Sequence, residues 1–111
     1  VVHQDDAILA LDKPSGLPVH PSASYHKNTL TYLLRQRYGS DAPQIAHRLD
    51  RETSGLLLCG RTLDAERALK MDFENRRVSK RYLAVVYGSP EPPSGLIDAA
   101  IAAEQAEPVL A

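Results

Sequence analysis

The stretch that decides the fold is His47-Arg48-Leu49-Asp50-Arg51-Glu52-Thr53-Ser54-Gly55-Leu56-Leu57-Leu58. Its first part is charged, whereas its end begins an apolar run that a second glycine closes. Such a run predicts a strand over residues 55–61 that is buried on both faces. Carboxylates are rarely placed beside a buried strand unless they are paired or used in chemistry. We therefore expect Thr53-Ser54-Gly55 to turn the chain from a polar site into the core of a sheet.

The segments on either side alternate between strand patterns and helix patterns. We predict a strand over residues 7–12 and a helix from Asn28 or Thr29, as its cap, to about residue 37. Thr62 is expected to cap the second helix. This second helix is predicted over residues 64–74, and an extended piece is predicted over residues 45–50. We also predict strands over residues 78–88 and 96–101, with a linker between them over residues 89–95. This mixed order predicts an α+β fold with a sheet as its core.

The composition bounds the class of protein. The 111 residues correspond to one domain or a piece of one, and the formal net charge of −1 is not that of a strongly basic nucleic-acid binder. A local basic groove is still possible, because the basic residues cluster at Arg35, Arg37, Arg48, Arg51, Arg76, Arg77, Lys80 and Arg81.

Several classes of protein are disfavoured by what the sequence does not contain. It has neither a signal peptide pattern nor an apolar run that could cross a membrane, and its only cysteine, Cys59, is expected to be a buried thiol. We therefore expect a cytoplasmic protein. The histidines and Cys59 show no metal-ligand spacing, so no metal is predicted. Ser54, His47 and Asp50 lack the nucleophile-elbow pattern of a hydrolase triad.

Asp50 is the strongest candidate for a catalytic group in this stretch. Arg48 and Arg51 flank it, and a nearby cation favours the ionised form of a carboxyl group. An ionised carboxylate can attack a sugar carbon or stabilise positive charge on it. Two other interpretations remain open at this point. Asp50 can belong to a structural ion-pair network, or it can pair with Glu52, ~6.6 Å along a strand, as in a sugar-processing hydrolase.

Three blocks of sequence together resemble the RluA-type pseudouridine synthases. The first is His47-Arg48-Leu49-Asp50 followed by Thr53-Ser54-Gly55-Leu56, which is similar to the signature of that family. The second is Lys13-Pro14-Ser15-Gly16-Leu17 with Val19-His20-Pro21, and the third comprises Phe73, Val78, Lys80, Tyr82, Ala84 and Gly88. The blocks stand in the family's order and extend from about Ile8 to Gly88.

The resemblance implies an enzyme that isomerises uridine to pseudouridine in RNA without a cofactor. It breaks the N1–C1′ bond, turns the uracil and rejoins it through C5. The implied partner is ribosomal RNA of the large subunit, or else transfer RNA, and the enzyme is expected to be a monomer. The implied fold is a mixed, mainly antiparallel sheet with flanking helices.

The resemblance also assigns roles to individual residues. Asp50 would be the catalytic aspartate, and Tyr82 would stack on the target uracil and serve a later proton transfer. Arg48 would fill the gap left by the flipped nucleotide, and a guanidinium plane suits that task. Other basic residues near these positions are assigned to RNA binding, namely Arg51, Lys80 and Arg81. The structural part of the motif comprises His47, Leu49, Thr53, Ser54 and Gly55.

One part of the family's pattern is absent from the sequence. The family carries a later strand whose arginine pairs with the catalytic aspartate, and no such block follows Gly95. We therefore expect residues 1–111 to be the N-terminal portion of a single catalytic domain, with an incomplete fold. The main alternative is an inactive RNA-binding protein of the same fold. Taken without the resemblance, Tyr82 would by default be a core or cross-strand aromatic and Arg48 a surface residue.

Overall fold

The computed structural model of the protein describes residues 1–21 and 28–100. Contacts between residues divide the chain into two units, Val1–Lys80 and Arg81–Ala111. The first unit contains all the described helices and strands. Within the described residues, none of the helices has the length and hydropathy needed to cross a membrane.

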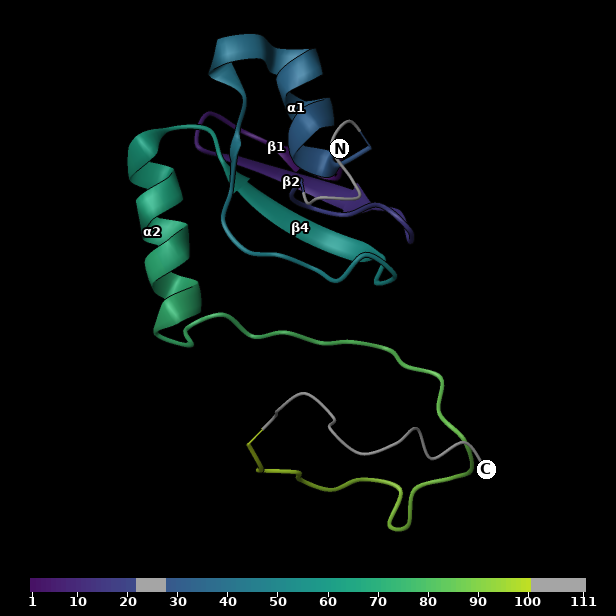
Figure 1. The fold of residues 1–111 in the computed structure, drawn as a ribbon. Helices are drawn as coiled ribbons and strands as arrows, with labels where there is room; N and C mark the ends of the chain where they lie inside the picture. Colours follow the sequence, from purple (N-terminus) through teal and green to yellow (C-terminus); the bar gives the residue numbers. More distant parts are fainter. Residues whose placement is uncertain (22–27, 101–111) are drawn as a thin grey trace. The chain divides into compact units, whose positions relative to one another are not determined.

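The first unit is built on a four-stranded antiparallel sheet (Figure 1). Its strands are β1 (His3–Gln4), β2 (Ile8–Lys13), β3 (Gln44–Ile45) and β4 (Gly55–Gly60), and they lie in the order β1-β2-β4-β3. The longest pairing joins β2 to β4, from Ile8 opposite Gly60 to Lys13 opposite Gly55. This antiparallel sheet with helices confirms the predicted α+β class.

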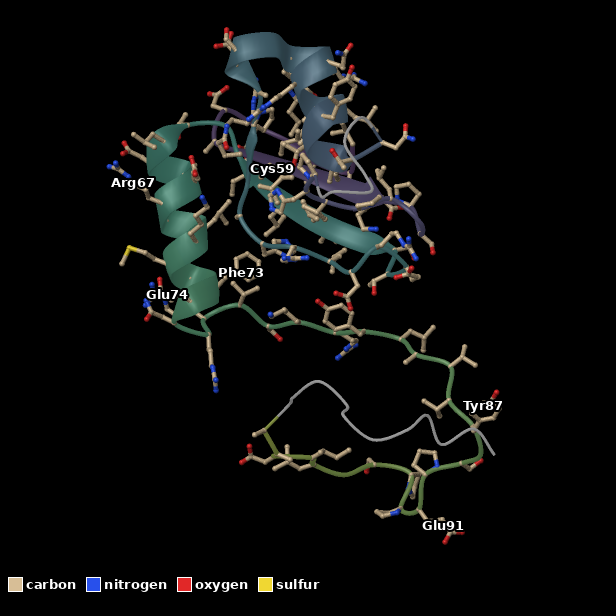
Figure 2. The ribbon with its side chains drawn as sticks, in the orientation of Figure 1. Cys59, Arg67, Phe73, Glu74, Tyr87 and Glu91 are labelled. Atoms are coloured by element: carbon tan, nitrogen blue, oxygen red, sulfur yellow. The ribbon has the colours of Figure 1, made fainter. Side chains whose placement is uncertain are left out.

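One face of the sheet forms the core with helix α1 (Leu30–Tyr38). Leu9 lies opposite Cys59 and Leu11 opposite Leu57, so the pleat sends all four side chains to the same face. Leu30 and Leu34 of α1 belong to the same buried cluster. Figure 1 shows α1 lying over the sheet. Cys59, labelled in Figure 2, is fully buried there, and burial raises the pKa of its thiol to about 11. The prediction of a buried, unreactive thiol is therefore confirmed.

Both helices begin at threonine caps. The Thr29 hydroxyl oxygen accepts a hydrogen bond from the Tyr32 amide at 3.2 Å, so Thr29 rather than Asn28 is the cap of α1. Thr62 accepts from the Ala65 amide at 3.1 Å in the same way and caps α2 (Leu63–Glu74), as predicted. After α1 the chain continues through a short 3₁₀ helix, η1 (Gly39–Asp41), to β3.

Three predicted features differ from the structure. Strand β4 is not buried on both faces, because Leu56 is 55% exposed while Leu57 is fully buried. Residues 78–88 form no strand, and residues 96–100 form none either, while residue 101 lies outside the described residues. Of the predicted extended piece over residues 45–50, Ile45 lies in strand β3 and the other residues lie outside strands. A β-strand needs a neighbouring strand for its N–H and C=O groups, and no described strand pairs with residues 78–88 or 96–100.

Helix α2 closely approaches the sheet at Gly60, the last residue of β4. A Cβ atom placed on Gly60 would lie 2.5 Å from the backbone nitrogen of Glu66 and 2.6 Å from its Cα. These atoms belong to the first turns of a helix and cannot move independently of it. The absence of a side chain at Gly60 therefore sets how α2 packs against β4.

We predict that Gly60→Ala lowers the free energy of unfolding by about 1–3 kcal/mol, because the added methyl group forces α2 away from β4. Gly95→Ala is the matched control, since a Cβ there would meet nothing within 4 Å, and it should change stability by less than about 0.5 kcal/mol. Urea denaturation of the two variants and the parent protein measures both effects. Equal stability of all three proteins would contradict this description of the packing.

Candidate active site

Asp50 lies in a turn between β3 and β4. The Thr53 amide donates a hydrogen bond to the Asp50 carbonyl at 3.1 Å, which closes the turn over residues 50–53. Leu49, just before the turn, is buried, whereas Asp50 itself is exposed. The buried leucine anchors the turn in the core, and the carboxyl group is left accessible at its start.

A buried lysine ties this turn to a second one. The Lys13 side chain is 1% exposed. Its Nζ atom donates to the carbonyl oxygens of Pro14 at 2.9 Å, Leu17 at 2.8 Å and Arg51 at 3.1 Å. An ammonium group has three N–H donors, so three carbonyl acceptors satisfy it fully. Lys13 therefore fastens the Pro14–Leu17 turn to the turn that carries Asp50.

Two further hydrogen bonds join the same two turns. The Gly16 amide donates to the Arg51 carbonyl at 2.7 Å, and the Ser15 hydroxyl donates to the Glu52 carbonyl at 2.7 Å. Gly16 has a φ of +92°, which glycine adopts without strain. We call this set of contacts, made by Lys13, Ser15 and Gly16 to the carbonyls of Arg51 and Glu52, the turn clamp.

Burial and the neighbouring negative charges act on the pKa of Lys13 in opposite directions. Burial lowers the pKa of the Lys13 ammonium, and the negative charges of Glu52 and Asp50 partly offset this effect. Sequence reasoning did not assign Lys13 to the site. The signal was present, because Lys13 follows Leu9 and Leu11 in the alternation of β2 and so falls on the core side of the sheet.

Glu52 is engaged by its neighbour in the turn. The Nε atom of Arg51 donates to Glu52 Oε1 at 2.6 Å, and this hydrogen bond is the main reason that the pKa of Glu52 is lowered. Residues 51 and 52 are in a turn and not in a strand. Asp50 and Glu52 therefore do not have the strand geometry on which the sugar-hydrolase interpretation depended. That interpretation assumed the wrong local structure.

His47 connects the motif to β4 and to α2. Its Nε2 atom accepts a hydrogen bond from the Leu58 amide at 3.0 Å, next to the position where the Ala46 amide bonds to the Leu58 carbonyl. Its ring stacks on Phe73, with centroids 4.2 Å apart. Figure 2 shows Phe73 projecting from the end of α2 toward this part of the chain. These contacts support the structural role that was predicted for His47.

The other predicted site residues are distributed over both units. Arg48 and Arg51 are exposed beside Asp50, and Lys80 places its ammonium 5.6 Å from the centre of the Phe73 ring. Ser54 is exposed, Thr53 is half-buried, and Gly55 begins β4 with a φ of +134°. Arg81 and Tyr82 belong to the second unit, where both are exposed. Their roles therefore stay predictions.

Across residues 1–21 and 28–100, no three histidine, cysteine or acidic side chains gather as metal ligands would.

We predict that Lys13→Met destabilises the protein by about 3–5 kcal/mol, because three carbonyl groups lose a charged donor and two turns lose their connection. Lys70→Met is the control. Lys70 is exposed and bonds to Glu66 Oε1 at 2.6 Å, a pair whose loss costs less than about 1 kcal/mol. Urea denaturation distinguishes the two variants, and a Lys13→Met protein as stable as Lys70→Met would show that the clamp is unimportant for stability.

His47 should make stability depend on pH. Burial, and secondarily the charge of Lys80, lower the pKa of His47 below its ordinary value of 6.5. The unfolded chain therefore binds a proton at His47 more readily than the folded one, and the stabilisation from neutral His47 is complete above pH 6.5 and lost as pH falls through the folded-state value.

The test is the urea midpoint measured between pH 7 and pH 5.5 for the parent protein and for His47→Gln. Glutamine can accept the Leu58 hydrogen bond through its side-chain oxygen but does not titrate. We expect the parent protein to lose stability over this range and His47→Gln to show a flatter profile. Parallel profiles would mean that His47 does not titrate differently in the folded and unfolded states.

Comparison with known proteins places the chain in a family. Residues 7–110 match the family described as RNA pseudouridylate synthase. The ribosomal large subunit pseudouridine synthase D of Xanthomonas campestris is 42% identical over 93 residues, which are 80% of this chain and 28% of that protein. The dual-specificity RNA pseudouridine synthase RluA of Escherichia coli K12 is 38% identical over 99 residues, which are 88% of this chain and 44% of that protein.

Other relatives show the same pattern. The tRNA pseudouridine(31) synthase of Saccharomyces cerevisiae is 41% identical over 88 residues, 79% of this chain and 21% of that protein. The structure of human RNA pseudouridylate synthase domain containing 4 superposes with a TM-score of 0.57 at 28% identity, over 69% of this chain and 30% of the human one. The chain thus spans less than half the length of each of these relatives. The resemblance carried by the three sequence blocks is confirmed, and the chain belongs to the RNA pseudouridylate synthase family, among its RluA-type members.

Proposed function

We propose that the whole protein isomerises specific uridines to pseudouridine in structured RNA, with Asp50 as the catalytic carboxylate. The observation that carries the proposal is the exposed Asp50 at the start of a turn that Lys13, Ser15 and Gly16 hold in place. A catalytic group must be held within a fraction of an ångström of its productive position, and it must also be reachable. The hydrogen bonds to the carbonyls of Arg51 and Glu52 and the exposure of Asp50 support the proposal on both points.

The carboxylate suits the first step of the reaction. Cleavage of the N1–C1′ bond leaves positive charge at the ribose carbon, which an ionised aspartate can capture or stabilise. No group is added to or removed from the RNA overall, because the same uracil is rejoined through C5. Whether Asp50 bonds covalently to C1′ or assists a glycal-type route does not change its place in the site.

The RNA must present the nucleotide outside its stack before this step. Flipping a nucleotide costs a few kcal/mol of lost stacking, which inserted and stacking side chains can repay. We assign the insertion to Arg48, which is exposed two residues before Asp50, and the stacking on uracil to Tyr82. Arg51, Lys80 and Arg81 are assigned to the phosphate backbone.

Large-subunit ribosomal RNA is the first substrate that we propose and transfer RNA the second. The names of the relatives support both substrates, since one names the ribosomal large subunit, one names dual specificity and one names tRNA. The alternative function, an RNA-binding protein without activity, makes no use of an exposed carboxylate at a fixed turn.

The decisive assay is tritium release from RNA labelled at uracil C5, with the full-length protein and its Asp50→Asn variant. We expect the variant to lose activity by a factor on the order of 10³ or more, because the amide is not a nucleophile and carries no charge. Asp6→Asn, which changes an exposed carboxylate in the turn between β1 and β2, is the control and should keep full activity.

The possible results separate the two functions. Release by the parent protein and equal release by Asp50→Asn would refute the assignment of Asp50. No release by the parent protein from ribosomal or transfer RNA, together with unchanged RNA affinity in both proteins, would favour the inactive RNA-binding alternative.

A further inference from the structure

A cavity of about 310 Å³ lies beside the motif but does not include Asp50. Its walls come from three parts of the first unit: helix α1 with Arg35, the segment around β3 that ends at Arg48, and helix α2 with Lys70. His20 lines it as well, from the block that follows β2. The cavity therefore collects basic side chains that are far apart in sequence.

The charge in this cavity is of one sign. Arg35, Arg48 and Lys70 line it, and within residues 1–21 and 28–100 no aspartate or glutamate does. Lys70 is bonded to Glu66. The guanidinium groups of Arg35 and Arg48, in contrast, make no hydrogen bond or ion pair with any other residue among residues 1–21 and 28–100. Both arginines are exposed, so their guanidinium groups are hydrated in the free protein and are available to a bound anion.

The inner wall of the cavity is apolar. Leu34 and Ala46 are buried there, at 6% and 9% exposure. A cleft with charges of one sign and walls of low dielectric concentrates the electric field on a bound ion. The guanidinium fork matches two oxygens of a phosphate or carboxylate group. These features favour an anion over an uncharged ligand, and in an enzyme that acts on RNA the anion at hand is a backbone phosphate.

The cavity lies close to Asp50 along the chain, because Arg48 is one of its lining residues. Arg48 is two residues before Asp50, so the backbone separates them by no more than about 7 Å. We propose that Arg35 holds one backbone phosphate of the RNA in this cavity, within a nucleotide or two of the uridine that reaches Asp50, while Arg48, which lines the same cavity, keeps its assignment to the gap left by the flipped nucleotide. This inference rests on RNA being the substrate, and it adds a binding subsite built on Arg35 to the proposed function.

Arg35→Gln in the full-length protein is the test, and Arg37→Gln is its matched control. Both arginines are exposed on α1, two residues apart, but Arg37 lies against the Tyr38 ring and does not line the cavity. The probe is a labelled single-stranded RNA of mixed sequence, titrated by fluorescence anisotropy between 50 and 200 mM salt.

We expect Arg35→Gln to bind the RNA about 5- to 10-fold more weakly and to reduce the slope of log K against log salt by about 0.7, the value for one phosphate contact on a single strand. Arg37→Gln should stay within about twofold of the parent protein with an unchanged slope. Unchanged binding by Arg35→Gln would overturn the proposal. So would equal losses in both variants, which would indicate diffuse attraction.

A kinetic measurement separates this subsite from the proposed function. In the tritium-release assay, Arg35→Gln should raise KM and leave kcat unchanged, because the phosphate contact is the same in the ground state and the transition state. If the parent protein is inactive but Arg35→Gln binds RNA weakly, the isomerase proposal fails and the subsite stands. If the parent protein is active and Arg35→Gln matches it in KM and RNA affinity, only the subsite fails.

Discussion

The three hydrogen bonds of the Lys13 ammonium hold the site together. They connect the turn after β2 to the turn before β4, across 38 positions of sequence. A buried cation is costly to remove from water, and only full satisfaction by well-placed acceptors makes it tolerable. The sheet supplies this geometry, because β2 and β4 are antiparallel and Lys13 lies opposite Gly55 at the end where both turns meet.

The position of Asp50 depends on this arrangement. Leu49 anchors one side of its turn in the core, the turn clamp holds the carbonyls of Arg51 and Glu52, and His47 fixes the approaching chain to β4 and Phe73. Most residues of the segment from His47 to Gly55 thus fix the turn from which the exposed Asp50 carboxylate projects. In our proposal the RNA brings the target ribose to that carboxylate, while the basic cavity beside it holds the backbone.

The sequence predicted the elements whose signals are local. Thr62, the leucines of α1 and the apolar run of β4 each specify their element through neighbours that are close in sequence, and the structure confirms both helices and the β2 and β4 strands. Features that depend on distant partners were missed or wrong. Residues 78–88 have strand propensity, but none of the described strands pairs with them. The roles of Lys13 and Arg35 depend on which turns and helices meet in the folded protein, and the local sequence does not show this. The family assignment from the motif was confirmed, but the motif alone did not show what positions Asp50.

The most direct test is a crystal structure of the full-length Asp50→Asn protein bound to a uridine-containing substrate RNA. The account predicts a nucleotide flipped out of the RNA, with its ribose C1′ about 3.5 Å from the side chain at position 50, and Lys13 still bonded to the carbonyls of Pro14, Leu17 and Arg51. A flipped ribose bound elsewhere on the enzyme, with residue 50 facing solvent and the Lys13 contacts broken, would contradict it.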